Sequence, residues 1–421
     1  MTAVSAEWVL PGDGPPIRHG LVRFEDAHIA EVAAGRAERH FEQAVIVPGF
    51  VNAHSHLEYA NYAGFADGSP FGPWISTHVA RKDRLGPDEM LAIARLGALD
   101  SLRSGVTTTA DYSFSGAAAT AARELGLRAI VYLEVFAVDP AGAERQWEEK
   151  RSLVDETELV RIGISPHAPY TCSVETYHYC LSLGVPVGTH LAESANELEW
   201  LLHGRGPLQG IAPFLVPPSG RRPVATLEPV LGPELLCAHC VEVEPDEVAV
   251  LAARGVPVAH CPRSNALLGC GIAPLAALRD AGVTVGLGTD SPASTPSFDV
   301  FEELRAAVSF ARARDRRAEA LTAADALALA TSEAARALRL DSEVGTLSPG
   351  KRADLTVVSL EGSPYYPIED PAAAVVFGGS PDRVLETIVD GQTRYRRQEE
   401  EQWREVRSIA SAARARMLGS P

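Results

Sequence analysis

Two histidines stand one residue apart in the segment PGFVNAHSHLEY, residues 48–59, directly after a run of apolar residues. His54 and His56 occupy positions i and i+2 of what the pattern indicates is a buried strand, so their side chains point to the same face. Burying two polar rings without partners is unfavourable. Two neutral imidazoles that converge on one point suit a divalent metal ion, whereas a lone histidine at such a position is more often an ordinary core residue.

Polar residues also stand at or near the ends of later apolar runs, at His167, His190, Glu193, His239 and Asp290. His190 closes PVGTHLA and is followed three residues later by a glutamate, while Asp290 closes VTVGLGTD. If these runs are parallel strands, their carboxyl ends lie at one end of the sheet and the polar side chains meet there. Imidazoles and a carboxylate in that arrangement are typical of a metal-dependent active site.

The remaining histidines have simpler interpretations. His260 lies in the short run VPVAHC among tightly packed residue types, and we expect a structural role for it. Six others fall on predicted helix surfaces, loops or the β-rich ends of the chain, where an ordinary role is expected: His19, His28, His40, His78, His178 and His203.

The elements that must position these residues alternate along the chain. Apolar runs rich in β-branched residues are separated by amphipathic segments, which indicates a parallel sheet buried on both faces and predicts a closed (β/α)8 TIM barrel. A doubly wound open sheet is the alternative, but the glycine-rich phosphate turn expected after its first strand is absent. The expected strands are residues 44–54, 106–111, 127–136, 160–165, 186–192, 235–240, 256–261 and 283–290.

The two ends of the chain differ from the barrel. Residues 1–47 and 341–396 contain short strands with turns, among them AAAVVFG at residues 372–378, and we expect them to form one composite β-sandwich domain. The barrel, residues 48–340, is inserted between them. The Gly- and Pro-rich segment 204–223 is expected to be a surface insertion or a lid-like loop. Residues 397–421 have helical spacing and are expected to dock on the outside.

Composition excludes several classes of partner. The 421 residues are 46% hydrophobic and carry a formal charge of −17, which argues against nucleic acid or an anionic membrane as a partner. No apolar stretch reaches the roughly 18–20 residues that span a bilayer, and the first residues lack the pattern of a signal peptide. A cytoplasmic location is expected. Cys237 and Cys240 form a C-x-x-C, but no second close pair completes a zinc site, so the six cysteines are expected to be buried thiols.

Several segments together resemble the amidohydrolase superfamily, in the branch that holds nucleobase and nucleoside deaminases and triazine hydrolases. These segments, in order and at family-like spacing, are PGFVNAHSHLE, SPHAPYTCS, THLAES, AHC, VAHCPRSNALLGCGIAPLAALRDAGVTVGLGTDS and GTLSPGKRADLTVV. The resemblance implies a (β/α)8 barrel with a composite β-sandwich. It also implies a metal held by His54, His56, His190 and Asp290, with Glu193 and His239 moving protons.

The chemistry of these residues agrees with the implied roles. A bound metal lowers the pKa of water to about 7 and so supplies hydroxide at neutral pH. Asp290 can both ligate the metal and accept a proton from that water. Glu193 can carry the proton to a ring nitrogen of the substrate, and His239 can polarise the attacked carbon.

The resemblance also predicts how many ions are bound. Two-metal members of the superfamily bridge their ions with a carboxylated lysine or a glutamate near the end of the fourth strand, and residues 159–170, LVRIGISPHAPY, contain neither. We therefore expect one divalent ion. Zinc is the first choice for three histidines and an aspartate, with Fe2+ or Mn2+ as alternatives.

The motifs are most similar to enzymes that deaminate adenine-type nucleosides, namely S-adenosylhomocysteine/methylthioadenosine deaminases and aminodeoxyfutalosine deaminases. In the first group a glutamate after the first strand binds the ribose hydroxyls, but this chain has PFGPW at residues 70–74. That departure favours an aminodeoxyfutalosine-like substrate with an aryl group on C5′. Five residues are candidate substrate contacts: His167 for the heterocycle, Trp74 for an apolar 5′ group, Glu58 for hydroxyls, and Arg145 and Arg161 for a carboxylate.

Several alternatives remain at this stage. Glu58 can instead cap a loop, the two arginines can be solvated surface residues, and Trp74 can belong to the core. The enzyme can belong to the same branch yet act on a free nucleobase or a triazine-type heterocycle by deamination, dechlorination or deguanidination. A metal-free scaffold is a third possibility, which the complete set of site residues disfavours. The expected partner is a small heterocyclic molecule, and a homo-oligomer, a dimer, is the expected assembly.

Overall fold

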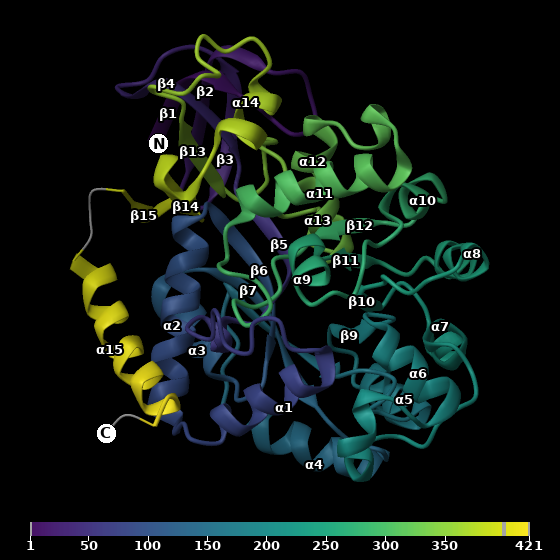
Figure 1. Cartoon of the computed structure of the whole chain (residues 1–421). Coiled ribbons are helices and arrows are strands. Elements are labelled where there is room, and N and C mark those ends of the chain that lie inside the picture. The colour runs from purple at the N-terminus through teal and green to yellow at the C-terminus, as the bar shows by residue number, and fades with distance from the viewer. Residues whose placement is uncertain (1, 398–400, 420–421) are drawn as a thin grey trace.

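The structure is a computed structural model that describes residues 2–397 and 401–419. Its main part is a parallel sheet whose strands follow one another in chain order, wrapped by helices (Figure 1). These strands are β5 (Phe50–Ser55), β6 (Val106–Ser113), β7 (Arg128–Val135), β8 (Val160–Pro166), β9 (Val187–Leu191), β10 (Leu235–His239), β11 (Val258–His260) and β12 (Val285–Leu287). This arrangement confirms the predicted (β/α)8 barrel.

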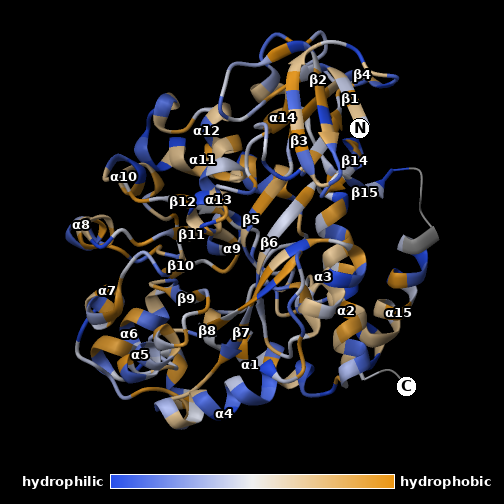
Figure 2. Ribbon diagram, turned by 180° about the vertical axis from the view of Figure 1, so that it is seen from behind, coloured by the Kyte–Doolittle hydropathy of each residue, from blue (hydrophilic) through white to orange (hydrophobic). Residues whose placement is uncertain are grey.

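Helices fill the connections between the strands. The helices carry both hydrophilic and hydrophobic residues (Figure 2), as expected when one side of a helix packs on a barrel and the other faces water. They are α1 (Phe71–Lys82), α2 (Pro87–Arg103), α3 (Ala117–Leu125), α4 (Pro140–Arg151), α5 (Val174–Ser182), α6 (Ala195–His203), α7 (Pro223–Leu227), α8 (Pro245–Ala253), α9 (Pro262–Leu267) and α10 (Leu275–Asp280). After β12 come α11 (Val300–Asp315), α12 (Ala323–Leu329) and α13 (Ser332–Ala337).

The backbone pairing that closes the barrel between its first and last strands is short. Ser55 and Asp290 form one isolated parallel bridge, and the backbone N–H of Asp290 donates to the carbonyl oxygen of His54 at 2.9 Å. The sheet is therefore joined at the point where two of the predicted metal ligands stand, so the closure of the barrel and the geometry of the site depend on the same residues.

The first predicted strand is two strands. β4 (Arg39–Pro48) ends at a proline, and β5 starts at Phe50 in the other sheet. Gly49 lies between them, where a Cβ atom would stand only 2.2 Å from the side chain of Thr107. The chain can pass from one sheet to the other here because glycine leaves room for that close approach.

Strands from both ends of the chain form a separate seven-stranded mixed sheet, in the order β15-β14-β13-β4-β1-β2-β3. β13 pairs antiparallel with β4 and so joins the two ends of the chain in one sheet, as expected for a domain built from both termini. The other members are β1 (Thr2–Val9), β2 (Ile17–Glu25), β3 (His28–Ala34), β13 (Leu355–Ser359), β14 (Val384–Val389) and β15 (Gln392–Arg396).

A buried ion pair fixes this sheet on the barrel. Arg128 at the start of β7 donates from Nε to Asp354 Oδ2 at 3.1 Å and from Nη2 to Asp354 Oδ1 at 3.3 Å, and Asp390 accepts from the same guanidinium. Arg128 and Asp354 are both buried. Because removal of one partner from a buried pair costs about 3–5 kcal/mol, this contact is a firm link between the two sheets.

One predicted strand is a helix. The segment AAAVVFG at residues 372–378 lies in α14 (Pro371–Gly378), so the expectation of a strand there is wrong. The Asp370 carboxylate accepts from the backbone N–H groups of Ala372 and Ala373, and a proline occupies the first helical turn. The capping aspartate and the proline favour a helix here, because the apolar run is too short for a helical or strand periodicity to be recognised in the sequence. α14 packs on α11 and α12.

The Gly- and Pro-rich segment 204–223 is partly ordered into a 3-10 helix (Pro207–Phe214) beside α1. Leu208 is fully buried in a cluster with Tyr170 and Trp200, and Phe214 is exposed. The segment is an insertion on the surface, as expected, but its first half is anchored by a small core of its own.

The C-terminal segment includes α15 (Glu401–Met417), which packs along α2 (Figure 1). The side-chain amide of Asn61 donates to the carbonyl of Ala410 at 3.0 Å, and Arg416 pairs with Glu89 at 2.6 Å. Residues 398–400 and 420–421 of the predicted helical segment 397–421 lie outside the described residues. Within the described part of the chain, no helix combines the length and the apolar character needed to cross a membrane.

Candidate metal and catalytic site

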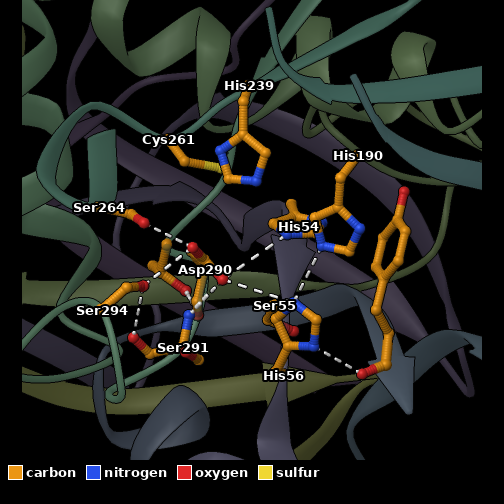
Figure 3. Close-up of polar contacts among 12 residues, drawn as sticks. His54, Ser55, His56, His190, His239, Cys261, Ser264, Asp290, Ser291 and Ser294 are labelled. Carbon is orange, nitrogen blue, oxygen red and sulfur yellow. Dashed lines mark hydrogen bonds and ion pairs between the residues drawn. The ribbon is translucent and has the colours of Figure 1, made fainter. Parts of the chain in front are cut away.

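Three histidines and one aspartate converge at the carboxyl end of the barrel (Figure 3). Asp290 Oδ1 lies 3.7 Å from His54 Nε2 and 3.5 Å from His56 Nε2, and His56 Nε2 lies 3.4 Å from His190 Nε2. The histidines come from the end of β5 and from β9, and the aspartate follows β12. All four side chains are buried, so the structure brings together the four residues predicted to hold a metal.

Hydrogen bonds aim these side chains at their common centre. His56 Nδ1 donates to the carbonyl of Tyr112 and His190 Nδ1 donates to the carbonyl of His167, each at 2.8 Å. In a neutral ring this places the lone pair on Nε2, the atom that faces the centre. The Asp290 carboxylate accepts from Ser264 Oγ at 2.6 Å, from Ser294 Oγ at 2.9 Å and from the N–H of Ser291 at 2.8 Å (Figure 3).

His54 shows why a metal fits this centre. Its side chain is completely buried, and neither ring nitrogen has a hydrogen-bond partner among the described residues. Burial, together with the neighbouring His56 and His190, holds the pKa of His54 well below its usual value, so the ring is neutral. An uncharged imidazole without a partner in the protein interior is costly. Three neutral imidazoles and a carboxylate are the donor set that zinc and similar ions bind.

Glu193 and His239 face each other beside this centre. Glu193 Oε1 lies 3.8 Å from His239 Nε2, and His239 Nδ1 is hydrogen-bonded to Asn265 Oδ1 at 3.0 Å. Burial raises the pKa of Glu193 above its usual value. The glutamate lies in the turn between β9 and α6. The Glu197 carboxylate holds that turn by accepting from the N–H of Glu193 at 2.8 Å.

The backbone is left-handed at three of the strand ends that form the site. The residues with φ between 48° and 75° there are Ala192, His239, Cys240 and Asp290. Side chains other than glycine adopt this region at a cost of about 1–3 kcal/mol each, and such residues cluster at functional sites. Two hydrogen bonds join the turns that follow β9 and β10. Cys240 N–H donates to the Leu191 carbonyl at 3.0 Å, and Val241 N–H donates to the Ala192 carbonyl at 2.9 Å.

Two of the predicted substrate contacts lie near the centre. His167 follows β8, and its ring centroid is 4.9 Å from that of His190 and 4.6 Å from that of Phe136. Burial lowers the pKa of His167 to about 3, so it is neutral at physiological pH. Trp74 on α1 donates from Nε1 to the carbonyl of Ala293 at 3.2 Å. Ala293 lies three residues after Asp290 in the sequence.

The other three predicted contacts are placed elsewhere. The Glu58 carboxylate accepts from Ser113 Oγ and, at 3.0 Å each, from the N–H of Phe114 and from both the N–H and Oγ of Ser115, which is the loop-capping alternative. Arg145 is exposed on α4. The expectation for Arg161 is wrong: it stands near the start of β8, at the opposite end of the barrel, and pairs with Glu343.

The sequence reasoning missed three charged residues beside the centre. Glu134, the penultimate residue of β7, is buried, and a carboxylate oxygen of it lies within 4.8 Å of ring nitrogens of His167 and His190. Lys82 at the end of α1 and Lys150 on α4 lie close to it. Glu134 could have been found from the sequence, because it is an acidic residue at the end of an apolar run. The lysines had none, because a lysine on an amphipathic helix usually faces water.

The expectation for the cysteines agrees with the structure. All six are free and buried, and burial raises the pKa of each thiol. The clusters of possible metal ligands within residues 2–397 and 401–419 contain histidine, aspartate and glutamate but no cysteine.

Comparisons with known proteins find a matching family, similar sequences and similar solved structures. Residues 45–394 match the model of the Amidohydrolase family. A 5′-deoxyadenosine deaminase from Methanothermobacter thermautotrophicus is 32% identical, with 97% of each chain covered. A 5-methylthioadenosine/S-adenosylhomocysteine deaminase from Symbiobacterium thermophilum is 33% identical, over 91% of this chain and 85% of its own. Among solved structures, an adenosine deaminase from Xanthomonas campestris with bound zinc superposes with a TM-score of 0.86 at 25% identity, covering 99% of this chain and 98% of its own.

The convergence of ligands generates a test of metal binding. We predict about one divalent ion per chain in the wild-type protein and almost none in a variant that carries both His54→Ala and His56→Ala, because two of four donors are lost. His178→Ala, an exposed position on α5, is the matched control and should keep its ion. Elemental analysis of the purified, folded proteins gives the ratio, and full occupancy in the double variant would exclude this site.

Proposed function

The chain belongs to the amidohydrolase family, and from that premise we propose that it hydrolyses the exocyclic amine of a 6-aminopurine nucleoside, giving the 6-oxo product and ammonia. The observation that carries the proposal is the buried pair of Glu193 and His239 beside the converging imidazoles and Asp290. The two curated relatives, both named as deaminases of adenosine-type nucleosides, support the choice of substrate class.

We propose that His54, His56, His190 and Asp290 hold one divalent ion. Zinc is favoured by the donor set and by the zinc described in the Xanthomonas enzyme, with Fe2+ or Mn2+ as alternatives. When bound, such an ion supplies hydroxide at neutral pH and stabilises negative charge that develops beside it. Asp290 is placed to receive a proton at Oδ1, the oxygen nearest the imidazoles.

Glu193 is proposed as the group that moves the proton to the substrate. Burial raises the pKa of Glu193 above its usual value, which is the direction that favours proton exchange by a carboxyl group near neutral pH. Protonation of a purine ring nitrogen draws electrons from the neighbouring carbon that bears the amine, which prepares that carbon for attack. The amine then leaves as ammonia once it has gained a proton.

His239 is proposed to polarise the reacting carbon, and His167 is proposed to orient the heterocycle. The hydrogen bond to Asn265 fixes the His239 ring with Nε2 toward Glu193, where it can stabilise charge at the reacting carbon. His167 Nδ1 is hydrogen-bonded to Thr171 Oγ1 at 3.0 Å, so the other ring nitrogen, Nε2, is free to contact the heterocycle. Because Glu58 is occupied by the loop at residues 113–115, we propose Glu134 in its place as the acceptor for ribose hydroxyls.

The choice of substrate class has a direct test. We predict that the metal-loaded enzyme releases ammonia from adenosine, 5′-deoxyadenosine, methylthioadenosine, S-adenosylhomocysteine or aminodeoxyfutalosine with a higher kcat/KM than from guanine or cytosine. A chlorotriazine, assayed for chloride, represents the runner-up reaction. If no adenine nucleoside were turned over while a free base or the triazine was processed well, the alternative function would replace this one. If no compound reacted, the scaffold alternative would gain support.

The role of Glu193 has a separate test. Glu193→Gln should retain the ion and the fold but lose about 10²–10⁴ in kcat, because an amide cannot carry the proton. Glu199→Gln, which changes the solvent-facing glutamate that pairs with Arg205, is the control and should remain active. Steady-state ammonia release and metal content are measured for both proteins. Near-normal kcat in Glu193→Gln with bound metal would assign proton transfer to another group.

A further inference from the structure

Lysine is very rare in this chain, and its placement is uneven. Of the 38 basic residues only three are lysines, at positions 82, 150 and 351, so arginine supplies almost every other positive charge. Two of the three meet beside the candidate active site, although one comes from α1 and the other from α4. Lysine differs from arginine in being a compact point charge with three donors and no planar fork.

Both ammonium groups lie against the same aromatic ring. Lys82 Nζ is 3.2 Å from the centroid of Phe114, and Lys150 Nζ is 4.6 Å from it. Lys82 donates to the hydroxyl of Tyr59 at 3.3 Å, and Lys150 donates to the backbone carbonyl of Glu134 at 2.7 Å. Each ammonium therefore uses one of its three N–H donors and keeps two for another acceptor.

No carboxylate in the described structure lies within ion-pair distance, 4.0 Å, of either lysine. Glu58 is close enough to influence their charge, but its oxygens are used by the loop at residues 113–115. Glu134 is also close, and its carboxylate makes no hydrogen bond with any described residue. Partly buried charges without a counter-ion in contact are unfavourable, and an anionic ligand can supply that counter-ion.

A row of aromatic rings connects the lysines with the catalytic centre. His190 contacts His167, His167 contacts Phe136 at 4.6 Å, and Phe136 contacts Phe114 at 6.3 Å between ring centroids. A nucleoside whose amine lies at Glu193 can extend along this row, with its ribose near Glu134. In that orientation the substituent on C5′ would extend toward the two ammonium groups.

We propose that Lys82 and Lys150 bind a carboxylate carried on the 5′ substituent of the nucleoside, and that this pair makes the enzyme selective for acidic over neutral 5′ groups. This inference rests on the proposed function. A carboxylate suits the site better than a phosphate dianion, because two glutamates already stand near the two lysines. The aromatic walls formed by Tyr59, Phe114 and Phe136 favour an apolar spacer between the ribose and the acid.

The test uses a matched pair of substrates, 5′-S-(carboxybenzyl)-5′-thioadenosine and its uncharged 5′-S-benzyl counterpart. Wild-type enzyme should prefer the acid, and Lys82→Met and Lys150→Met should each lower the ratio of acid to neutral kcat/KM by about 10- to 100-fold, the value of a hydrogen bond to a charged group. Lys351→Met, the third lysine, should leave the ratio unchanged. The loss should fall mainly on KM, because the lysines are proposed to contact the 5′ substituent and not the reacting atoms.

A second readout does not depend on turnover. With lysine labelled at the ε carbon with 13C, the protein gives three side-chain signals, which the three methionine variants assign. The 6-oxo form of the acidic nucleoside should shift the signals of Lys82 and Lys150 and not that of Lys351. If both nucleosides are deaminated but the ratio is insensitive to the lysines, this inference fails while the proposed function stands. If neither nucleoside reacts, the proposed function fails and the lysine signals decide whether an acid binds there.

Discussion

The burial of His54 is the constraint on which the rest of the site depends. Its imidazole is enclosed by His56, His190, His239 and Tyr112, and neither ring nitrogen has a hydrogen-bond partner among the described residues. Such a ring is stable in a protein interior only when something else supplies the missing interaction. We propose that a divalent ion shared with the neighbouring imidazoles and Asp290 supplies it. The same residues also close the barrel, because the backbone of Asp290 bonds to that of His54.

The surrounding structure keeps this group of side chains in place. Three serines hold the carboxylate of Asp290, and two backbone carbonyls orient His56 and His190. Left-handed turns at the ends of β9, β10 and β12 bring the side chains inward, at a cost in backbone energy that the folded barrel offsets. The site therefore divides into two parts. One part consists of the buried imidazoles and Asp290. The other, toward Glu134 and Phe114, holds the ammonium groups of Lys82 and Lys150.

The convergence of His54, His56, His190 and Asp290 could be predicted from the sequence for a physical reason. In a parallel barrel the carboxyl ends of all strands face one side, so a polar residue at the end of an apolar run has a known position. Other positions depend on long-range packing and could not be predicted from the sequence. Arg161 is near the site in sequence, but it stands at the start of its strand and hence at the far end of the barrel. Residues 372–378 are short and apolar, and the capping by Asp370 made them a helix. Lys82 and Lys150 come from helices whose rotation about their axes cannot be inferred from one sequence.

Metal-edge anomalous diffraction from crystals of the purified protein tests the central claim most directly. We expect one anomalous peak per chain, within ligand distance of His54, His56, His190 and Asp290. The competing position is the neighbouring group of Glu134, His167 and His190, which also offers three possible ligands. A peak there with none at His54, or no peak from protein that deaminates nucleosides, would exclude a metal ion held by His54, His56, His190 and Asp290.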